Sequence, residues 1–267
     1  MIGDSFILGD GAENNLSLAD SAVSLVMQGK LDRIFGSGRY EILNFGLKGV
    51  NTLDELFILK EFVLKYNPDL VILAVSGNDW YFQDYNPDPY VYCDVESSFS
   101  GRIIHSLSRT SVVFNYFDKR LRKDRMSSSD EEGIFNRKCF NISISRIGST
   151  LSNEKILSFA PYIFDSYNPD PNPENIFKDL ESEEDVNSEI DFVHSCLESV
   201  GFIYVDTYPF IMNLTNREVF ADDQYHFSRK VNYLIADIIL NHILDRRLIP
   251  GCQSIDCESK KATLSHE

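Results

Sequence analysis

The sequence begins with Met-Ile-Gly-Asp-Ser-Phe-Ile-Leu-Gly-Asp-Gly, residues 1–11, and the rest of the chain is organised around this stretch. We call its centre, Gly3-Asp4-Ser5, block I. Three later segments give block I its meaning: residues 44–49 (Asn-Phe-Gly-Leu-Lys-Gly, block II), 76–79 (Ser-Gly-Asn-Asp, block III) and 223–226 (Asp-Gln-Tyr-His, the fourth block). Blocks II and III each follow a run that reads as a buried strand. We therefore expect Ser5 on a strand-to-helix turn near two further loops.

Strand-like and helix-like segments alternate along the chain. Residues 69–75 form a continuous apolar run, which is typical of a strand covered on both faces. Residues 52–55 (Thr-Leu-Asp-Glu) match a capping box with Thr52 as the cap and Glu55 as its partner, which predicts the start of a helix. Further strands are predicted at 40–44, 155–160 and 202–206, and further helices at about 16–31, 103–121, 184–199 and 231–243. This alternation predicts a parallel sheet with right-handed crossovers.

No break between domains is evident. We expect one domain over residues 1–247, with a polar insertion at about 123–150 and a mobile loop near 127–133 within it. Residues 248–267 are polar and are expected to form a loose tail.

The composition limits the classes of partner. A formal net charge of −16 argues against nucleic acid, since phosphate binding requires a positive surface. The basic run at 119–125 is expected to be a solvated helix end. The five cysteines are scattered and indicate neither a disulfide framework nor a zinc site, although Cys252 and Cys257 could pair. No apolar run is long enough to span a membrane.

The location of the protein is left open by the sequence. The default is the cytoplasm, because no signal peptide is visible. Only Met1 and Ile2 precede block I, however, so the first strand is expected to be truncated, and an upstream signal or anchor stays possible.

The four blocks, in this order, resemble those of the SGNH (GDSL) hydrolases, and the resemblance extends from Gly3 to about Ala236. It implies a three-layer α/β/α sandwich with a central parallel sheet. It also implies a catalytic triad of Ser5, Asp223 and His226, in which the imidazole takes the serine proton and the carboxylate orients the imidazole. The implied oxyanion donors are Ser5, Gly49 and Asn78, and no metal or organic cofactor is required.

Two departures from the family pattern stand out. Ser76 occupies the place of the usual first glycine of block III, and Phe227 stands where proline often follows the histidine. The α/β-hydrolase pattern fits less well, because Ser5 lacks a Gly-x-Ser-x-Gly elbow and the acid and histidine share one short segment.

Simpler interpretations of single residues remain open. Ser5 could be a helix cap, and Asp222, Asp223 and His226 could ligate a metal, although no second cluster completes a coordination shell. The pentapeptide Tyr-Asn-Pro-Asp-Pro occurs at both 85–89 and 167–171. Turn chemistry explains its prolines, while Tyr85, Tyr90 or Tyr167 could line a substrate cleft.

The function that this pattern favours is serine ester hydrolysis through an acyl-enzyme. Acyl transfer to, or deacetylation of, a glycan is an alternative that uses the same residues, and a non-catalytic binding module with the same fold is another. The expected partner is a small acyl ester or an acylated glycan. The oligomeric state is left open.

Overall fold

A five-stranded parallel sheet forms the centre of the computed structural model. The structure describes residues 1–9, 22–76, 79, 129–151, 155–160, 183–211, 214, 216–219 and 227–252. Within these residues the strands are β1 (Ile2–Gly3), β2 (Phe45–Gly46), β3 (Leu70–Ala74), β4 (Lys155–Ala160) and β5 (Ile203–Asp206). Their order across the sheet is β2-β1-β3-β4-β5. The strand order therefore reverses at β1, a doubly wound arrangement.

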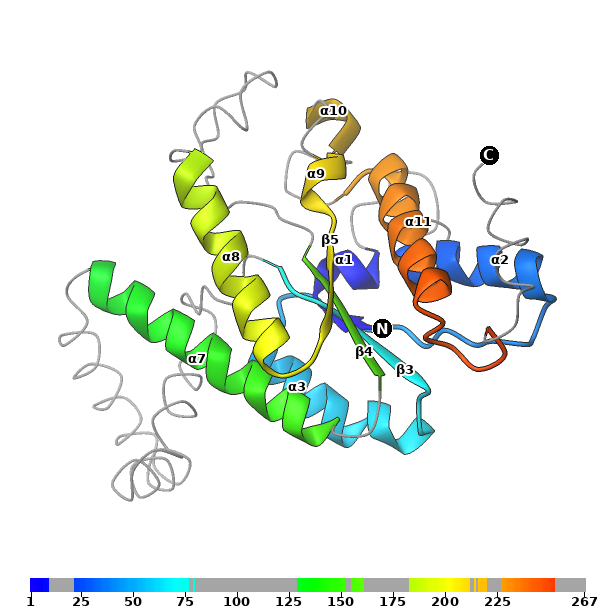
Figure 1. The fold of residues 1–267 in the computed structure, drawn as a ribbon, viewed down its shortest axis with the longest axis horizontal. Coiled ribbons are helices and arrows are strands. Elements are labelled where there is room, and N and C mark those ends of the chain that lie inside the picture. Colours follow the sequence, from blue (N-terminus) through cyan, green and yellow to red (C-terminus); the bar gives the residue numbers. More distant parts are fainter. Residues whose placement is uncertain are drawn as a thin grey trace.

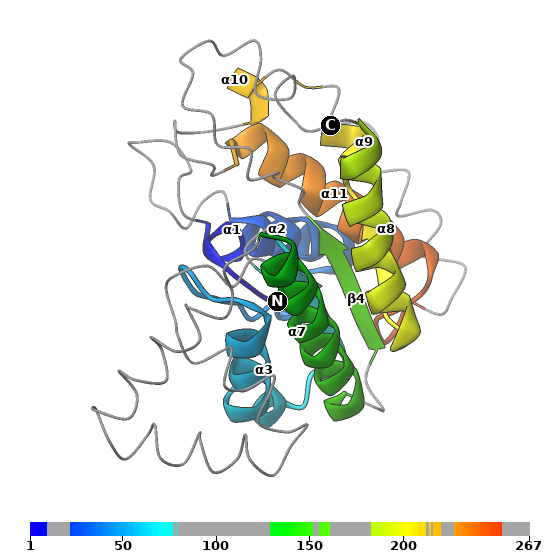
Figure 2. The same ribbon diagram turned by 90° about the vertical axis from the view of Figure 1, so that its left-hand side faces the viewer.

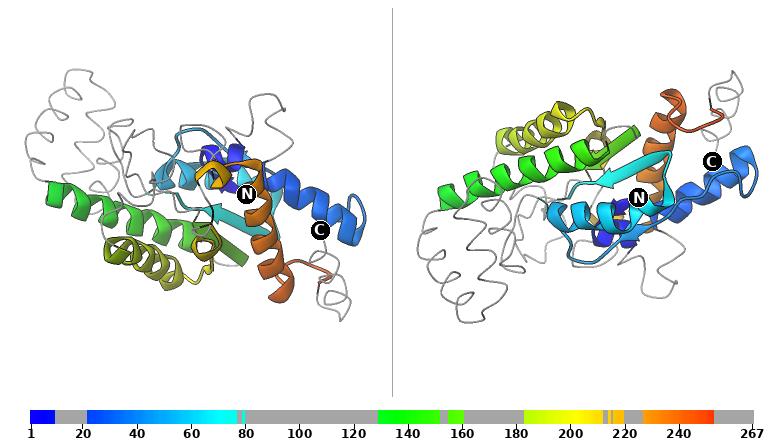
Figure 3. Two further views of the ribbon diagram at one scale, coloured as in Figure 1. Left: turned by 90° about the horizontal axis from the view of Figure 1, so that it is seen from above. Right: turned by 90° about the horizontal axis from the view of Figure 1, so that it is seen from below.

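Helices cover both faces of the sheet (Figures 1, 2 and 3). One face carries α2 (Val23–Phe35) and α11 (Arg229–Asp245), and the other carries α3 (Thr52–Glu61), α7 (Ser129–Thr150) and α8 (Glu183–Ser199). The shorter helices are α1 (Ser5–Leu8), the 3-10 helix η2 (Val63–Tyr66), α9 (Tyr208–Ile211) and α10 (Asn216–Val219). This arrangement confirms the predicted three-layer α/β/α sandwich.

Strand β3 supplies side chains to both hydrophobic cores. Ile72 and Ala74 belong to the core beneath α2 and α11, whereas Val71, Leu73 and Val75 belong to the core beneath α3, α7 and α8. Successive side chains of a strand point to opposite faces, so a strand that is buried on both sides must be apolar throughout. Burial of both faces of β3 therefore explains the continuous apolar run at residues 69–75.

Strand β1 is short although it lies between two neighbours. Ile2 pairs with Phe45 of β2 and with Leu73 of β3, and Gly3 pairs with Gly46. By contrast, β3 and β4 pair over five residues, from Leu70 with Lys155 to Ala74 with Phe159. Strand β1 therefore contributes only Ile2 and Gly3 to the described sheet.

The strand expected at 40–44 is displaced to β2 at Phe45–Gly46. The Gln28 side chain explains part of this displacement, because it accepts a hydrogen bond from the Ile42 N–H (2.7 Å) and donates one to the Tyr40 carbonyl (3.0 Å). These main-chain groups are therefore paired with a side chain and not with a neighbouring strand.

The helix predicted at Thr52 has a different cap. Asn51 is the N-cap, and its side chain accepts hydrogen bonds from the N–H groups of Leu53 (3.0 Å) and Asp54 (3.3 Å). Asp54 completes the capping box by accepting from the Asn51 N–H at 3.3 Å. The predicted pair of Thr52 and Glu55 is therefore wrong by one residue, and both side chains are buried instead.

Two segments that were expected to be irregular are ordered. Residues 129–150 form α7, whose buried Phe140, Ile144 and Ile147 pack in the core beneath α3 and α8. Leu248 and Ile249, expected in the tail, are buried against the core beneath α11. The helices predicted at 184–199 and 231–243 are confirmed by α8 and α11. The helix predicted at 103–121 lies outside the described residues, and α2 begins at Val23 within the helix expected from residue 16.

The sequence indicated no disulfide framework, yet disulfide bonds are present. Cys139 and Cys252 are each disulfide-bonded, whereas Cys196 is a free thiol whose pKa is raised by burial to about 11. Of the helices that the structure describes, none combines the length and the apolar character needed to cross a bilayer.

Candidate active site

Block I lies between β1 and α1. Gly3 ends β1 and Ser5 begins α1, with the buried Asp4 between them. The turn closes tightly, because the Leu8 N–H donates to the Asp4 carbonyl at 3.1 Å. A Cβ at Gly3 would lie 2.5 Å from Cγ1 of Ile7, so this position requires glycine. The backbone of Ser5 is therefore placed on the predicted strand-to-helix turn, while its side chain lies outside the described part of the structure.

Block II contains β2 and packs against block I. The Asn44 side chain donates to the Ile7 carbonyl (2.6 Å) and to the Ser24 hydroxyl (2.9 Å), and it accepts from the Gly46 N–H (2.8 Å). Asn44 thus ties the start of β2 to both α1 and α2, a structural role that the sequence did not reveal. Gly49 is exposed and adopts a φ of +70°, a left-handed conformation that favours glycine.

Block III follows β3 and is held by buried hydrogen bonds. The Ser76 N–H donates to Oδ2 of Asp79 at 2.7 Å, and the Asp79 N–H donates to the Ser76 carbonyl at 3.0 Å. The Thr52 hydroxyl of α3 donates to Oδ1 of Asp79 at 2.9 Å. The Ser76 hydroxyl donates to Oδ2 of Asp4 at 2.9 Å and so connects block III to block I. Asn78, the predicted oxyanion donor, lies outside the described residues.

Blocks I, II and III lie at one edge of the sheet. They lie at the carboxyl ends of β1, β2 and β3, which are adjacent and parallel, so these ends reach the same edge (Figure 1). The chain passes from β1 to β2 on one side and then returns from β2 to β3 on the other side of β1. Open α/β sheets bind ligands at such a reversal, outside the carboxyl ends of the strands. The structure therefore assembles three of the four blocks where the fold favours a site.

The fourth block falls outside the described residues, as do Asp223 and His226 themselves. The chain directly after His226 is well anchored. Phe227 is buried in the core beneath α11, and Ser228 caps that helix by accepting a hydrogen bond from the Val231 N–H at 3.3 Å. The Ser228 N–H also donates to the Val219 carbonyl of α10 at 2.7 Å. Tyr85, Tyr90 and Tyr167 lie outside the described residues as well.

The electrostatics of this edge are set by buried carboxyl groups. Burial and the nearby Asp4 carboxylate raise the pKa of Asp79 well above its usual value, although its hydrogen bonds from Ser76 and Thr52 oppose this shift. Burial, followed by the charges of Asp79, Asp4 and Asp54, raises the pKa of Glu55 well above its usual value. The sequence assigned Glu55 to a helix cap and did not place it at this site.

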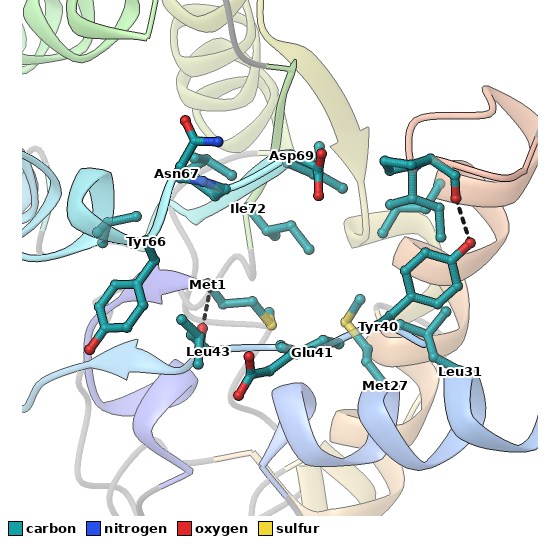
Figure 4. Close-up of a pocket in the computed structure, with 18 of the residues that line it drawn as sticks. Met1, Met27, Leu31, Tyr40, Glu41, Leu43, Tyr66, Asn67, Asp69 and Ile72 are labelled. Atoms are coloured by element: carbon teal, nitrogen blue, oxygen red, sulfur yellow. Dashed lines mark hydrogen bonds between the residues drawn. The ribbon is translucent and has the colours of Figure 1, made fainter. Parts of the chain in front are cut away.

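A cavity of about 310 Å³ lies at the opposite edge of the sheet, next to the amino ends of β1 and β3 (Figure 4). Apolar side chains form much of its wall, among them Met1, Met27, Leu31 and Ile72. It lies between residues 41–43 and 70–72, where β1 supplies no residues. Because the blocks lie at the other edge, this cavity is separate from the candidate active site.

The amino group of Met1 lies beside this cavity. It donates a hydrogen bond to the Leu43 carbonyl at 2.7 Å (Figure 4). Burial lowers the pKa of this amine to about 5, because the charged form is poorly solvated there.

Asp222, Asp223 and His226, which the sequence offered as possible metal ligands, lie outside the described residues. Within the part of the chain that the structure describes, no group of three His, Cys, Asp or Glu side chains could hold a metal ion.

Comparisons with known proteins find similarity in structure and not in sequence. The α/β hydrolase LAE5, from the metagenome of Lake Arreo, Spain, is 17% identical, with 90% of this chain and 91% of that chain covered and a TM-score of 0.53. The acetylxylan esterase Axe2 from Geobacillus stearothermophilus is 14% identical, with 91% of each chain covered and a TM-score of 0.52. The lipase/acylhydrolase from Enterococcus faecalis is 17% identical, with coverages of 92% and 95% and a TM-score of 0.52.

No protein-family model matches the sequence, and a search of curated proteins found no match. At such low identities the structural likeness establishes the fold. The chain shares the fold of these solved structures, in agreement with the three-layer α/β/α architecture that the resemblance implied.

Proposed function

We propose that the chain is a serine ester hydrolase in which Ser5 attacks the carbonyl carbon of an acyl ester. One observation carries the proposal: blocks I, II and III meet at the strand-order reversal, and a 2.9 Å hydrogen bond from Ser76 to Asp4 links two of them. The similarity in fold to esterases and acylhydrolases supports the same chemistry.

The proposed first step forms an acyl-enzyme. His226 takes the proton of the Ser5 hydroxyl, while Asp223 orients the imidazole and stabilises its charged form. The new bond joins Ser5 Oγ to the acyl carbon, and the ester C–O bond breaks as His226 returns the proton to the leaving alcohol. Water, deprotonated by His226, then releases the acid and regenerates Ser5.

Three donors are proposed to stabilise the oxyanion: the N–H groups of Ser5 and Gly49 and the side-chain amide of Asn78. The N–H groups in the first turn of a helix have no partner within that helix, which makes the Ser5 amide at the start of α1 suitable. The left-handed backbone of Gly49 carries no Cβ that could hinder the substrate. Loss of one such donor typically costs about 3–4 kcal/mol of transition-state stabilisation.

The substrate class that we propose is a short acyl ester, including an acetyl group on a glycan. Two of the similar structures are acetylxylan esterases. Tyr85 and Tyr167 follow strands β3 and β4 in the sequence, and their rings could stack on a sugar or line a small acyl pocket.

The test is hydrolysis of p-nitrophenyl acetate and of acetylated xylan by the purified chain beside a Ser5→Ala variant. We expect activity that Ser5→Ala abolishes, and we expect an organophosphonate probe to label Ser5 in the unchanged protein. A folded protein without activity toward either substrate and without labelling would contradict the proposal and favour a binding module. Activity that appears only when a glycan acceptor is added would instead favour acyl transfer.

A further inference from the structure

Glu55 is a buried carboxyl group without a hydrogen-bond partner in the described part of the chain. Its residue is 1% exposed, and neither of its side-chain oxygens is hydrogen-bonded there. Buried polar groups are almost always hydrogen-bonded, and an unpaired one is costly. The capping role that would explain a glutamate at this position belongs to Asp54. The burial of an unpaired glutamate at this position therefore requires a different explanation.

Glu55 lies beside a chain of hydrogen bonds that leads to the nucleophile turn. On α3 it follows Thr52 by three residues, a spacing that places both side chains on one face of the helix. The Thr52 hydroxyl donates to Asp79 at 2.9 Å, the Ser76 N–H donates to Asp79 at 2.7 Å, and the Ser76 hydroxyl donates to Asp4 at 2.9 Å. All five residues are buried. We call Asp4, Glu55 and Asp79 the carboxyl cluster.

The hydrogen bonds indicate which member of the cluster carries a proton. Asp79 accepts from the Ser76 N–H and the Thr52 hydroxyl, and both bonds favour its ionised form. Glu55 accepts none from the residues that the structure describes. Close carboxyl groups in a buried site cannot all ionise, so the proton belongs on Glu55, in agreement with the raised pKa of that group.

Among the residues that the structure describes, the charges that act on Glu55 are all negative. They are those of Asp79 after β3, Asp4 after β1 and Asp54 on its own helix. Helix α7 also packs against α3, and its described residues supply Phe140 and Ile144 to the same core. Ionisation of Glu55 would therefore add a further negative charge beneath blocks I and III.

We propose that Glu55 is a positioning residue of the candidate active site: in its neutral form it adds no charge beside Asp4 and Asp79, and its ionisation as the pH rises slows the reaction. The inference rests on the proposed ester hydrolysis, in which negative charge develops on the substrate oxygen beside block III. A unit charge about 10 Å away, at an effective dielectric constant of about 20, changes a rate roughly tenfold. The effect falls on kcat, because the oxyanion exists only in the transition state and intermediate.

The experiment compares the full chain with Glu55→Gln and Glu55→Met. The matched control is Glu61→Gln, on the same helix but exposed. The kcat for p-nitrophenyl acetate is measured from pH 5 to 10 and corrected for spontaneous hydrolysis. We expect the unchanged protein and Glu61→Gln to lose roughly tenfold in kcat at alkaline pH. Both Glu55 variants should lack this loss, with unchanged KM and an unchanged fall at acidic pH, where His226 is protonated.

A second readout does not depend on activity. The infrared spectrum at neutral pH should contain the carbonyl band of a protonated carboxyl group that disappears in both Glu55 variants. An active enzyme whose alkaline loss persists in Glu55→Gln and Glu55→Met would overturn the positioning role, and so would absence of the band. A folded chain that shows the band but hydrolyses no ester would refute the proposed function. The role of Glu55 in that reaction would fall with it, but the protonation of Glu55 would still be established.

Discussion

Gly46 lies directly against the main chain of Ile7, so that a Cβ added at Gly46 would stand 2.7 Å from the Ile7 carbonyl carbon and closer still to Leu8. This contact packs block II against α1, the helix that begins at Ser5. The Asn44 side chain reinforces it by donating to the same Ile7 carbonyl at 2.6 Å. The position of the nucleophile turn therefore depends on block II as well as on its own strand.

Replacement of Gly46 by alanine should displace α1. Since the added methyl group would meet main-chain atoms and not the end of a flexible side chain, relief requires movement of the turn. We expect Gly46→Ala to lower the free energy of unfolding by about 1–3 kcal/mol and to lower kcat/KM for p-nitrophenyl acetate. Urea denaturation and steady-state kinetics measure the two effects.

Gly29→Ala is the matched control for this change. Gly29 lies within α2, and a Cβ there would meet no atom within 4 Å. Alanine is a better helix former, so this variant should gain about 0.5–1 kcal/mol of stability and keep its activity. Equal effects of the two substitutions would show that the packing of block II against α1 does not matter.

Thr52→Val should destabilise block III. The substitution keeps the shape of the buried side chain but removes the hydroxyl that donates to Asp79. A buried carboxyl group that loses a donor costs about 1–3 kcal/mol, and the pKa of Asp79 should rise further because the Thr52 hydrogen bond lowers it. Thermal and urea denaturation measure the loss. Thr52→Ser keeps the hydroxyl and should retain most of the stability; a valine variant as stable as the serine variant would contradict the assigned role.

Residues added before Met1 should stabilise the protein, because the cavity beside Met1 lies in line with β1. We expect a Lys-Val-Ile-Val extension to enter between residues 41–43 and 70–72 and to raise the Tm by several degrees. A Gly-Ser-Gly-Ser extension of the same length has little apolar surface to bury and should raise it less. Differential scanning calorimetry compares the three forms.

The gain from this extension should depend on pH. The Met1 amine has its pKa lowered from 8.0 to about 5, so between these values the unfolded chain binds a proton that the folded chain does not. Stability therefore falls as the pH falls from 8 to 5, by at most about 4 kcal/mol. An extension converts the amine to an amide and removes this dependence. Its stabilising effect should be larger at pH 5.5 than at pH 8, and equal effects would contradict burial of the free amine.

The sequence predicted best those elements whose pattern of apolar residues has one physical cause, burial in the core. Strand β3 and helix α11 are buried along whole faces, and burial imposes a continuous or helical apolar pattern. Helix α7 was missed because many polar residues and Gly133 outweighed the helical spacing of Phe140, Ile144 and Ile147. That spacing was visible and would have predicted a buried helix face.

The candidate site could be located from the sequence, but its supporting contacts could not. The blocks are short motifs at fixed places relative to predicted strands, so their convergence follows from a parallel sheet. The partner of a hydroxyl does not follow in this way: Thr52 could have capped its own helix, yet tertiary packing directs it to Asp79, and Asn51 takes the cap. Because Asn51 and Asp54 form the capping box, Glu55 takes no part in it and is buried instead.

The brevity of β1 has a consequence for how the molecule opens. Within the described residues, β2 joins the sheet through the pairs of Ile2 with Phe45 and of Gly3 with Gly46, and β1 joins β3 through the pair of Ile2 with Leu73. Strands β3, β4 and β5 are held by longer ladders. Local unfolding follows the weakest set of contacts, so amide protons of residues 44–49 should exchange with solvent before those of β3 to β5. The loop that carries Gly49 then belongs to a unit that opens separately from strands β3 to β5.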